Sequence, residues 1–296
     1  MNAPLRILMT GGTGFLGSAL LRKLAERPSC RITVLKRSFS RTNRVSDLLT
    51  APNIEWYDID KVFLEQIFER ERFDLIIHCA TNYGRGNTNM LDIVSANLML
   101  PLTLLQLAIR HGVRTFVNTD TIIDKRVNDY SLSKKQFLDW MCSAAGKIQC
   151  VNLALEHFYG PWDDESKFTT MVIHSLLRGT GELNLTPGEQ KRYFIHIDDV
   201  VSAFLCIIDH LDTISPNLSS FEVATENNIT IKDFVLLVKR LTHNESTHLN
   251  FGAAPYRANE LMNSKTDISG LKALGWRPET SLEDGLRKTI KAEQRK

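Results

Sequence analysis

Short apolar runs, separated by glycine turns or by stretches with helical spacing, dominate the first half of the chain. Runs of four to eight apolar residues between turn signals are typical of strands buried in a parallel sheet. Leu20, Leu21 and Leu24 then follow the first run with the spacing of a helix face. Strands that alternate with helices predict an α/β fold with a doubly wound parallel sheet. The predicted strands are residues 5–9, 31–35, 54–57, 74–81, 115–117 and 150–155.

Longer helical patterns follow. Residues 89–111 are apolar on almost every side, which predicts a helix buried between the sheet and a partner subunit. Residues 168–177 form an amphipathic pattern, and Thr280 with Glu283 predicts a capping box for a terminal helix. Pro101 leaves the carbonyl of Asn97 without its helical partner, and we hypothesise that a water bound there links Lys134 to solvent.

A glycine-rich turn lies between the first predicted strand and the first predicted helix. Such a turn lets backbone N–H groups approach a pyrophosphate, whose charge is stabilised at the positive end of the helix. A tight turn that merely needs glycine is the alternative. Because the motif has the required place between strand and helix, it predicts a dinucleotide site. The predicted cradle is Thr10-Gly11-Gly12-Thr13-Gly14-Phe15-Leu16-Gly17.

The residues after the second strand bear on the choice of cofactor. NAD sites usually place an acidic residue here for the ribose 2′-hydroxyl, but no acidic residue lies between Arg27 and Val45. Lys36, Arg37 and Ser38 instead suit a 2′-phosphate, so the sequence predicts NADP(H). A basic loop in contact with water is the alternative.

Further cofactor contacts are predicted at the ends of the third and fourth strands. Asp58, with Ile59, could reach the adenine amino group, or Asp58 could cap a helix that starts near Lys61. Cys79-Ala80-Thr81 is a run of small residues, which allows the backbone to pass close to the cofactor. His78, just before it, is expected to be a packed strand residue.

Tyr130 and Lys134 are four residues apart, so they share one face of a helix. An ammonium group beside a phenol favours the phenolate, so we expect Lys134 to lower the pKa of Tyr130 toward working pH. This would make Tyr130 a general acid. Thr119 ends the strand just before this helix, and the three residues together predict an active site; a surface Tyr–Lys pair is the alternative.

Charge and cysteine content narrow the class of protein. The 296 residues include 36 basic and 34 acidic side chains, which argues against a nucleic-acid partner bound through a global positive field. No apolar run is long enough to predict a membrane span, and the N-terminus lacks the pattern of a signal peptide. The five cysteines are scattered, so we expect reduced thiols, a cytoplasmic location and no metal site.

Taken together, these motifs resemble the extended short-chain dehydrogenases/reductases of the nucleotide-sugar epimerase/dehydratase type. The resemblance implies a Rossmann-type sheet with a smaller, interleaved C-terminal lobe for the substrate. It also implies that Thr119, Tyr130 and Lys134 are catalytic with support from Asn97, that Lys134 holds the nicotinamide ribose, and that the protein is a homodimer. Other matching segments are residues 74–80, Tyr159-Gly160-Pro161, Arg192 with residues 194–200, and Leu274-Gly275-Trp276-x-Pro278.

Two departures refine the resemblance. In the 4,6-dehydratases of this family an Asp-Glu pair follows the catalytic threonine, whereas Asp120-Thr121 stands here, which disfavours dehydration. Only eleven positions separate Thr119 from Tyr130, too few for the usual substrate loop. This stretch resembles the CDP-abequose/CDP-paratose synthases, which reduce a 4-keto-3,6-dideoxy sugar on CDP.

The resemblance therefore implies an NADPH-dependent reductase of the C4 ketone of a nucleotide-diphosphate 4-keto-deoxyhexose. A nucleotide-sugar 4-epimerase and a catalytically silent, cofactor-sensing protein are the alternatives. We expect residues 1–160 to bind the cofactor, parts of 192–228 to return to that domain, and 161–296 to hold the substrate. The expected substrate contacts are Tyr83, Asp120, Thr121, His157, Arg192 and Arg257.

Overall fold

The computed structural model describes residues 3–86, 88–257 and 260–294. It divides into two compact units, the first formed by Met1–Ala154 with Phe204–Phe221 and the second by Leu155–Ala203 with Glu222–Lys296. The elements in chain order are β1 (Leu5–Thr10), α1 (Phe15–Ala25), β2 (Cys30–Lys36), η1 (Asn43–Leu48), β3 (Ile54–Asp58), α2 (Leu64–Arg70), β4 (Leu75–His78), α3 (Met90–Val94), η2 (Ser95–Met99), α4 (Leu100–Arg110), β5 (Thr115–Thr121), α5 (Asp129–Ser143), β6 (Gln149–Leu155), β7 (His157–Tyr159), α6 (Phe168–Arg178), β8 (Glu182–Leu185), β9 (Lys191–Arg192), β10 (Phe194–His196), α7 (Ile197–Asp209), β11 (Leu218–Val223), β12 (Ile229–Thr230), α8 (Ile231–Leu241), β13 (His248–Phe251), α9 (Ser269–Ala273) and α10 (Leu282–Glu293).

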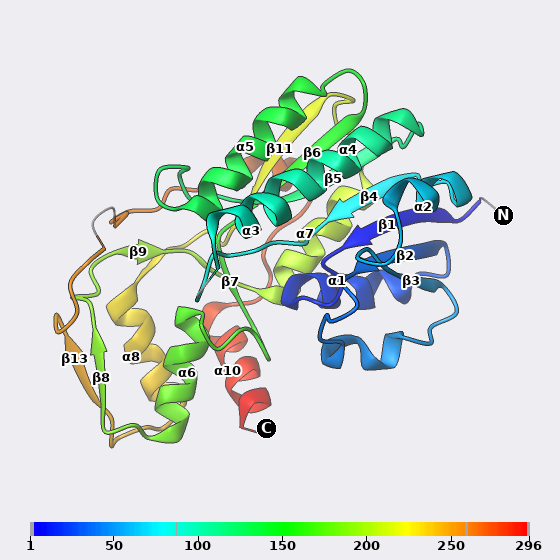
Figure 1. Cartoon of the computed structure of the whole chain (residues 1–296). Helices are drawn as coiled ribbons and strands as arrows, with labels where there is room; N and C mark the ends of the chain where they lie inside the picture. The colour runs from blue at the N-terminus through cyan, green and yellow to red at the C-terminus, as the bar shows by residue number, and fades with distance from the viewer. Residues whose placement is uncertain (1–2, 87, 258–259, 295–296) are drawn as a thin grey trace. The chain divides into compact units, whose positions relative to one another are not determined.

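The first unit is built on a seven-stranded sheet with the order β11-β6-β5-β4-β1-β2-β3 (Figure 1). The registers of β1 with β2, β2 with β3, β1 with β4 and β4 with β5 are all parallel. Successive strands in one direction need helical crossovers, which the intervening helices supply. The predicted Rossmann-type α/β sheet is confirmed.

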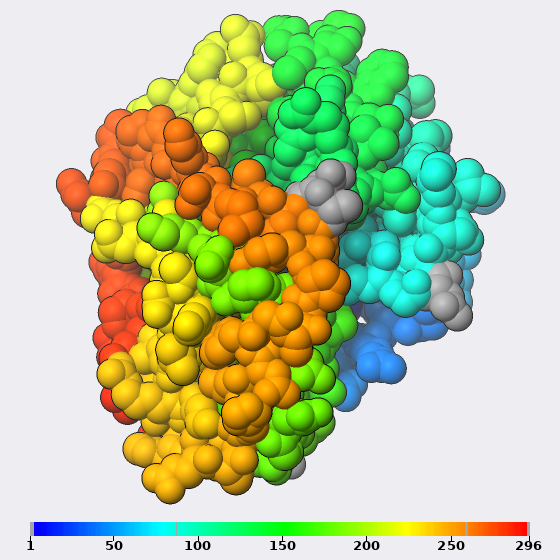
Figure 2. Space-filling model, turned by 90° about the vertical axis from the view of Figure 1, so that its left-hand side faces the viewer, coloured from blue at the N-terminus to red at the C-terminus, as the bar shows by residue number. Residues whose placement is uncertain are grey.

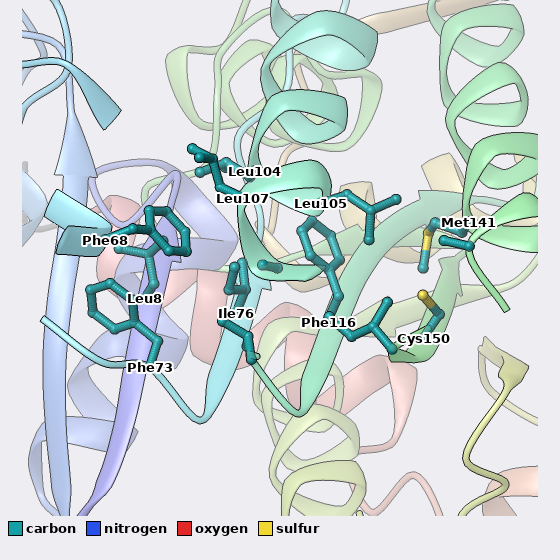
Figure 3. Packing of buried hydrophobic residues seen from close by; sticks show 14 of the residues in the cluster. Leu8, Phe68, Phe73, Ile76, Leu104, Leu105, Leu107, Phe116, Met141 and Cys150 are labelled. Carbon is teal, nitrogen blue, oxygen red and sulfur yellow. The ribbon is translucent and has the colours of Figure 1, made fainter. Parts of the chain in front are cut away.

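Helices cover the sheet because its strands are apolar on both faces. Leu8, Ile76 and Phe116 project from β1, β4 and β5 toward α2, α4 and α5, in a cluster that also contains Phe68 and Met141 (Figure 3). Leu8, Ile76 and Phe116 are fully buried, so this face of the sheet is closed to water. Such burial is the main favourable contribution to folding.

The segments α3, η2 and α4 form one continuous helix from Met90 to Arg110, with a π turn at Ser95–Met99. By length and composition this 21-residue helix could cross a membrane, contrary to the sequence expectation, although core helices of soluble proteins pass the same test. Leu104, Leu105 and Leu107 are buried in the core of the first unit. Packing against the sheet thus accounts for one apolar face of the helix.

The second unit consists of helices with short two-stranded sheets. A core of α6, α8 and α10 side chains includes Val172, Phe234 and Leu286. β8 and β13 pair in parallel, so a late segment lies against an early one of this unit, as the lime-green and orange surfaces of Figure 2 show. Helix α10 is capped by Ser281, which accepts from the Asp284 N–H, and not by the predicted Thr280.

Candidate functional site

The sheet order fixes where a ligand can bind in the first unit. After β1 the chain forms β2 and β3 on one side of this strand, and it then crosses over to form β4 and β5 on the other side. Ligands of open parallel sheets bind beyond the carboxyl ends of the strands at such a reversal. Thr10 ends β1, His78 ends β4, and the glycine-rich turn starts between them. The predicted cradle therefore lies at the expected edge of the sheet.

The turn after β1 can exist only with glycine at its close contacts. Gly11 has φ +71°, and a Cβ on it would lie 2.5 Å from the Ala80 nitrogen. A Cβ on Gly17 would lie 2.0 Å from the Gly11 carbonyl oxygen, so α1 packs directly on the turn. Gly14 is the N-cap of α1 and provides no side-chain cap. The backbone N–H groups at this helix end suit a pyrophosphate, so the residues present fit a dinucleotide cofactor.

The loop beyond β2 differs from the sequence expectation. Lys36 forms an ion pair with Asp58, and this contact is the largest cause of the lowered pKa of Asp58. The N-cap of α2 is Phe63, so Asp58 does not cap this helix. Ser38 donates both its N–H and its hydroxyl to Asp60, the N–H at 2.7 Å. An acidic side chain is therefore present beside the predicted 2′-phosphate site.

Sequence reasoning missed Asp60 because only the segment between Arg27 and Val45 was considered. A signal was available, since β2 and β3 pair in parallel and Lys36 lies opposite Asp58. The residues just beyond both strand ends must then be neighbours. Arg37 lies over the ring of Phe39, 4.7 Å from its centroid, which leaves its charge near the same loop.

The segment after β4 is fixed by two buried side chains. The Thr10 hydroxyl accepts from the Ala80 N–H at 3.2 Å and bonds the His78 ring at 2.8 Å, and His78 is fully buried as expected. Asn97 accepts from the Asn82 N–H at 2.7 Å and donates to the Asn82 carbonyl at 2.8 Å. Asn97 thus determines the path of the residues that follow Cys79.

Asn97 also connects this segment to α5, the helix that carries the predicted catalytic residues Tyr130 and Lys134. Its amide donates to the Ser133 hydroxyl at 3.0 Å, and the Thr81 hydroxyl lies 3.3 Å from its oxygen. Both amide hydrogens therefore bind groups other than Lys134. The water hypothesised at the Asn97 carbonyl stays a prediction.

Helix α5 begins at Asp129 with a capping box, in which Asn128 and Ser131 each bind the backbone of the other. Tyr130 and Lys134 follow within the first two turns and share a face. The Thr119 hydroxyl lies 3.4 Å from the sulfur of Cys79, so the ends of β4 and β5 are in contact. The three predicted catalytic residues and Cys79 are all near the carboxyl edge of the same sheet.

The predicted lowering of the Tyr130 pKa is wrong in this structure. Burial raises the pKa of Tyr130 well above its ordinary value, Tyr83 and Asp120 raise it further, and a hydrogen bond with the Thr121 side chain opposes them. The Tyr83 ring lies 5.1 Å from the Tyr130 ring, centroid to centroid. Tyr130 is thus held as the protonated phenol.

Lys134 is the buried cation of the site. Its side-chain nitrogen has no hydrogen-bond partner among the described residues, and burial lowers its pKa from 10.5 to about 8. An unpaired buried ammonium is unfavourable. A ribose hydroxyl pair is the kind of acceptor that would relieve it, which again fits the cofactor.

Asp120, an expected substrate contact, has an internal partner that sequence reasoning missed. Its side chain is fully buried and forms an ion pair with Lys135 at 2.7 Å. Because side chains alternate along a strand, Asp120 projects to the face of β5 opposite Thr119 and Thr121. A contact of Asp120 with the substrate stays a prediction.

Substrate contacts of Tyr83 and Thr121 in the first unit stay predictions, and the other three candidates lie in the second unit. His157 is partly exposed and its ring nitrogen lies 2.7 Å from the buried Glu156 carboxylate. Arg192 is buried and pairs with Glu260, while Arg257 is exposed. Their contacts with a substrate stay predictions.

Comparison with known proteins agrees with this geometry. The model of the NAD dependent epimerase/dehydratase family matches residues 7–223. The CDP-abequose synthase of Salmonella typhimurium is 32% identical over 96% of this chain and 97% of that protein. The CDP-abequose synthase of Yersinia pseudotuberculosis is 25% identical over 87% of this chain and 91% of that protein.

A solved structure shows the same fold. The UDP-glucose 4-epimerase of Thermotoga maritima superposes with a TM-score of 0.84 and 24% identity, covering 98% of this chain and 99% of that one. The family match spans the whole glycine cradle, the β4 segment and the Thr119–Tyr130–Lys134 set. This chain belongs to the NAD-dependent epimerase/dehydratase family of extended short-chain dehydrogenases/reductases.

Proposed function

We propose that this chain is an enzyme that reduces the C4 ketone of a CDP-linked 4-keto-deoxyhexose with NADPH, in deoxysugar and O-antigen biosynthesis. Its support is the 32% identity to a CDP-abequose synthase over 96% of the chain. The same relationship supports the coarser assignment to nucleotide-sugar-modifying enzymes. The observation that carries the chemistry is the unpaired, buried Lys134 ammonium one helical turn from Tyr130.

The chain's own groups are suited to carbonyl reduction. When bound, the nicotinamide supplies a hydride to the sugar C4. Tyr130 is held protonated, so its phenol can donate the proton that O4 takes as the C–O π electrons move onto the oxygen. The Thr119 hydroxyl is the second donor toward this oxygen, where preorganised donors have their largest effect. The Lys134 ammonium then stabilises the phenolate until solvent returns a proton.

The test is removal of the proton donor. Tyr130→Phe should lose on the order of 10²–10⁴-fold in kcat, the usual contribution of general acid catalysis, while it still binds NADPH. Tyr57→Phe is the matched control, because the Tyr57 hydroxyl bonds only Glu55 and Glu71 within the described residues. A Tyr130→Phe variant that turns over CDP-linked 4-keto sugars normally would overturn the assignment.

The choice of NADPH rests on Lys36, Arg37 and Ser38, and the neighbouring Asp60 acts against it. Fluorescence titration with NADPH and NADH measures the preference directly. We expect tighter binding of NADPH, and equal affinity for the two cofactors would remove the proposal.

A 4-epimerase would behave differently during purification, because its cofactor is regenerated in each cycle. It would retain NAD and need no added NADPH, which absorbance and mass spectrometry of the purified protein would reveal. A cofactor-sensing protein would bind nucleotide yet leave a panel of CDP-, dTDP-, GDP- and UDP-linked keto-sugars unchanged. We propose a homodimer in the cytoplasm as the working state.

A further inference from the structure

One buried charge of the first unit has no part in the proton and hydride transfers described above. The Asp120 carboxylate accepts from the Lys135 ammonium at 2.7 Å, from the Asn152 amide at 3.0 Å and from the Thr121 N–H at 2.7 Å. Asn152 is itself held by the Asn118 amide at 2.8 Å. These contacts join β5, β6 and α5, and the Asn118 Oδ1 is left without a hydrogen-bond partner among the described residues.

Stability is a poor explanation for such a network. A buried ion pair often contributes little or nothing compared with apolar side chains of the same size, because desolvation offsets the attraction. A fully buried carboxylate is costly unless it is paired and hydrogen-bonded, so this network offsets a cost that an apolar side chain would not have. Asp120 follows Thr119 directly in β5, and Lys135 follows Lys134 directly in α5. The pair is therefore formed by the residues that directly follow Thr119 and Lys134 in the chain.

The charged groups that act on Lys134 can be identified from each element around it. Asp120 of β5 raises the pKa of Lys134 and Lys135 of α5 lowers it, while burial is the largest cause of its fall to about 8. From β4 and its end, burial lowers the pKa of His78 well below its ordinary value and raises that of Cys79 to about 11. Both are therefore neutral at pH 7.

The loop after β4 acts on Tyr130. Tyr83 raises the pKa of Tyr130 and Arg85, which lies over the Tyr83 ring at 4.9 Å, lowers it. Around Lys134 itself, Asp120 raises the pKa of Lys134, and Lys135, the ion-pair partner of Asp120, lowers it. Their signs are opposite, so each should move Lys134 in its own direction.

We propose that Asp120 and Lys135 are positioning residues that set the charge of Lys134, Asp120 holding the buried ammonium protonated and Lys135 limiting that effect. The proposal rests on the proposed function, in which the Lys134 ammonium binds the cofactor ribose and stabilises the Tyr130 phenolate.

Two variants separate this role from a structural one. Asp120→Asn keeps the side-chain size and an oxygen for the Thr121 N–H but removes the charge. A nearby opposite charge shifts a pKa by about one to three units, so the Lys134 midpoint should fall by about one pH unit. Lys135→Gln removes the opposing charge and leaves the Asn152 and Thr121 bonds to Asp120 in place, so the midpoint should rise. Each unit is a tenfold change in the ratio of charged to neutral Lys134.

The measurement is a pH titration of the whole chain, free of cofactor, by NMR of its lysine ¹³Cε signals. Lys134→Arg identifies the signal by its loss. Opposite shifts in Asp120→Asn and Lys135→Gln support the proposal, since both variants break the same ion pair and a structural effect would move Lys134 alike. Shifts in the same direction, or none in either variant, would overturn it.

The neutral double variant Asp120→Asn/Lys135→Gln keeps the test valid if a single variant unfolds. It removes both charges together, so its Lys134 midpoint should lie between those of the single variants, and near that of the original chain. A midpoint of the double variant displaced by more than about one pH unit contradicts the electrostatic account.

Cofactor titration distinguishes failure of this inference from failure of the proposed function. NADPH affinity of the original chain should weaken as pH rises through about 8, the value to which burial lowers the pKa of Lys134. Asp120→Asn should show the same loss at lower pH. If the original chain binds neither NADPH nor NADH at any pH, the proposed function is wrong. If it binds NADPH but the variants leave the pH dependence unchanged, only the role of Asp120 and Lys135 is wrong.

Discussion

Replacing Asn97 with alanine tests whether this side chain anchors α5 to the segment after β4. The fully buried Asn97 side chain makes three close hydrogen bonds, to the Asn82 N–H at 2.7 Å, the Asn82 carbonyl at 2.8 Å and the Ser133 hydroxyl at 3.0 Å. At about 1 kcal/mol net for each bond, Asn97→Ala should lower the free energy of unfolding by about 3 kcal/mol. For a unit of this size the melting temperature should fall by roughly 6–12 °C.

The same variant should impair catalysis more than cofactor binding. Without Asn97 the loop and α5 lose their common anchor, and a displacement of about 1 Å at reacting groups can cost about 10²-fold in rate. Urea unfolding followed by circular dichroism gives the stability, and initial rates with NADPH and a CDP-linked 4-keto sugar give kcat and KM. Because the glycine cradle is untouched, NADPH affinity should change by less than kcat.

Thr103→Ala is the matched control on the same continuous helix. The exposed Thr103 hydroxyl donates only to the Met99 carbonyl of the preceding turn among the described contacts, so its loss should cost about 0.5 kcal/mol or less. Asn97→Asp should be as harmful as Asn97→Ala, because a carboxylate cannot donate to the Asn82 carbonyl. An Asn97→Ala chain within about 1 kcal/mol of the original, with unchanged kcat, would refute the anchoring role.

Three further changes have directions set by the structure. Gly17→Ala should abolish measurable NADPH binding by fluorescence, because its Cβ would lie 2.0 Å from the Gly11 carbonyl oxygen; normal affinity would contradict the cradle. Asp60→Asn should raise the ratio of NADPH to NADH affinity several-fold by removing a like charge beside a 2′-phosphate, and an unchanged ratio would exclude that contact. If α4 and α5 form the dimer contact, Trp140→Glu, at a half-exposed position of α5, should convert a dimer to a monomer in light scattering.

The sequence predicted those parts of the fold that depend on local pattern. The apolar runs placed the starts of β1 to β6 within one residue, but β4 ends three residues before its predicted end and β5 ends four residues after it; the glycine motif placed the start of α1. The ends of helices were predicted less reliably, because Ser281 and Thr280 are adjacent and both are residue types that cap helix N-termini. Geometry selected Ser281, whose hydroxyl accepts from the Asp284 N–H at 3.1 Å.

The candidate site was predicted by residue but not by environment. Spacing indicated that Tyr130 and Lys134 share a helix face, yet it gave no information on burial, which reverses the expected pKa shift of Tyr130. Asp60 was missed because its neighbour Ser38 lies in the loop beyond another strand, β2, 22 positions earlier. Contacts between parallel strands become visible only when the strand order is known.

The alternation of β5 bears on which reaction this edge of the sheet can support. Thr119 and Thr121 occupy one face of the strand and Asp120 the other, and it is the Thr121 side chain that hydrogen-bonds Tyr130. A hydroxyl can donate to a developing alkoxide, but it is far too weak a base at neutral pH to remove a carbon-bound proton. The one carboxylate of this strand is paired with Lys135 of α5. Under the proposed function, this pairing keeps Asp120 from serving as the base that elimination of water requires, which favours reduction of a ketone.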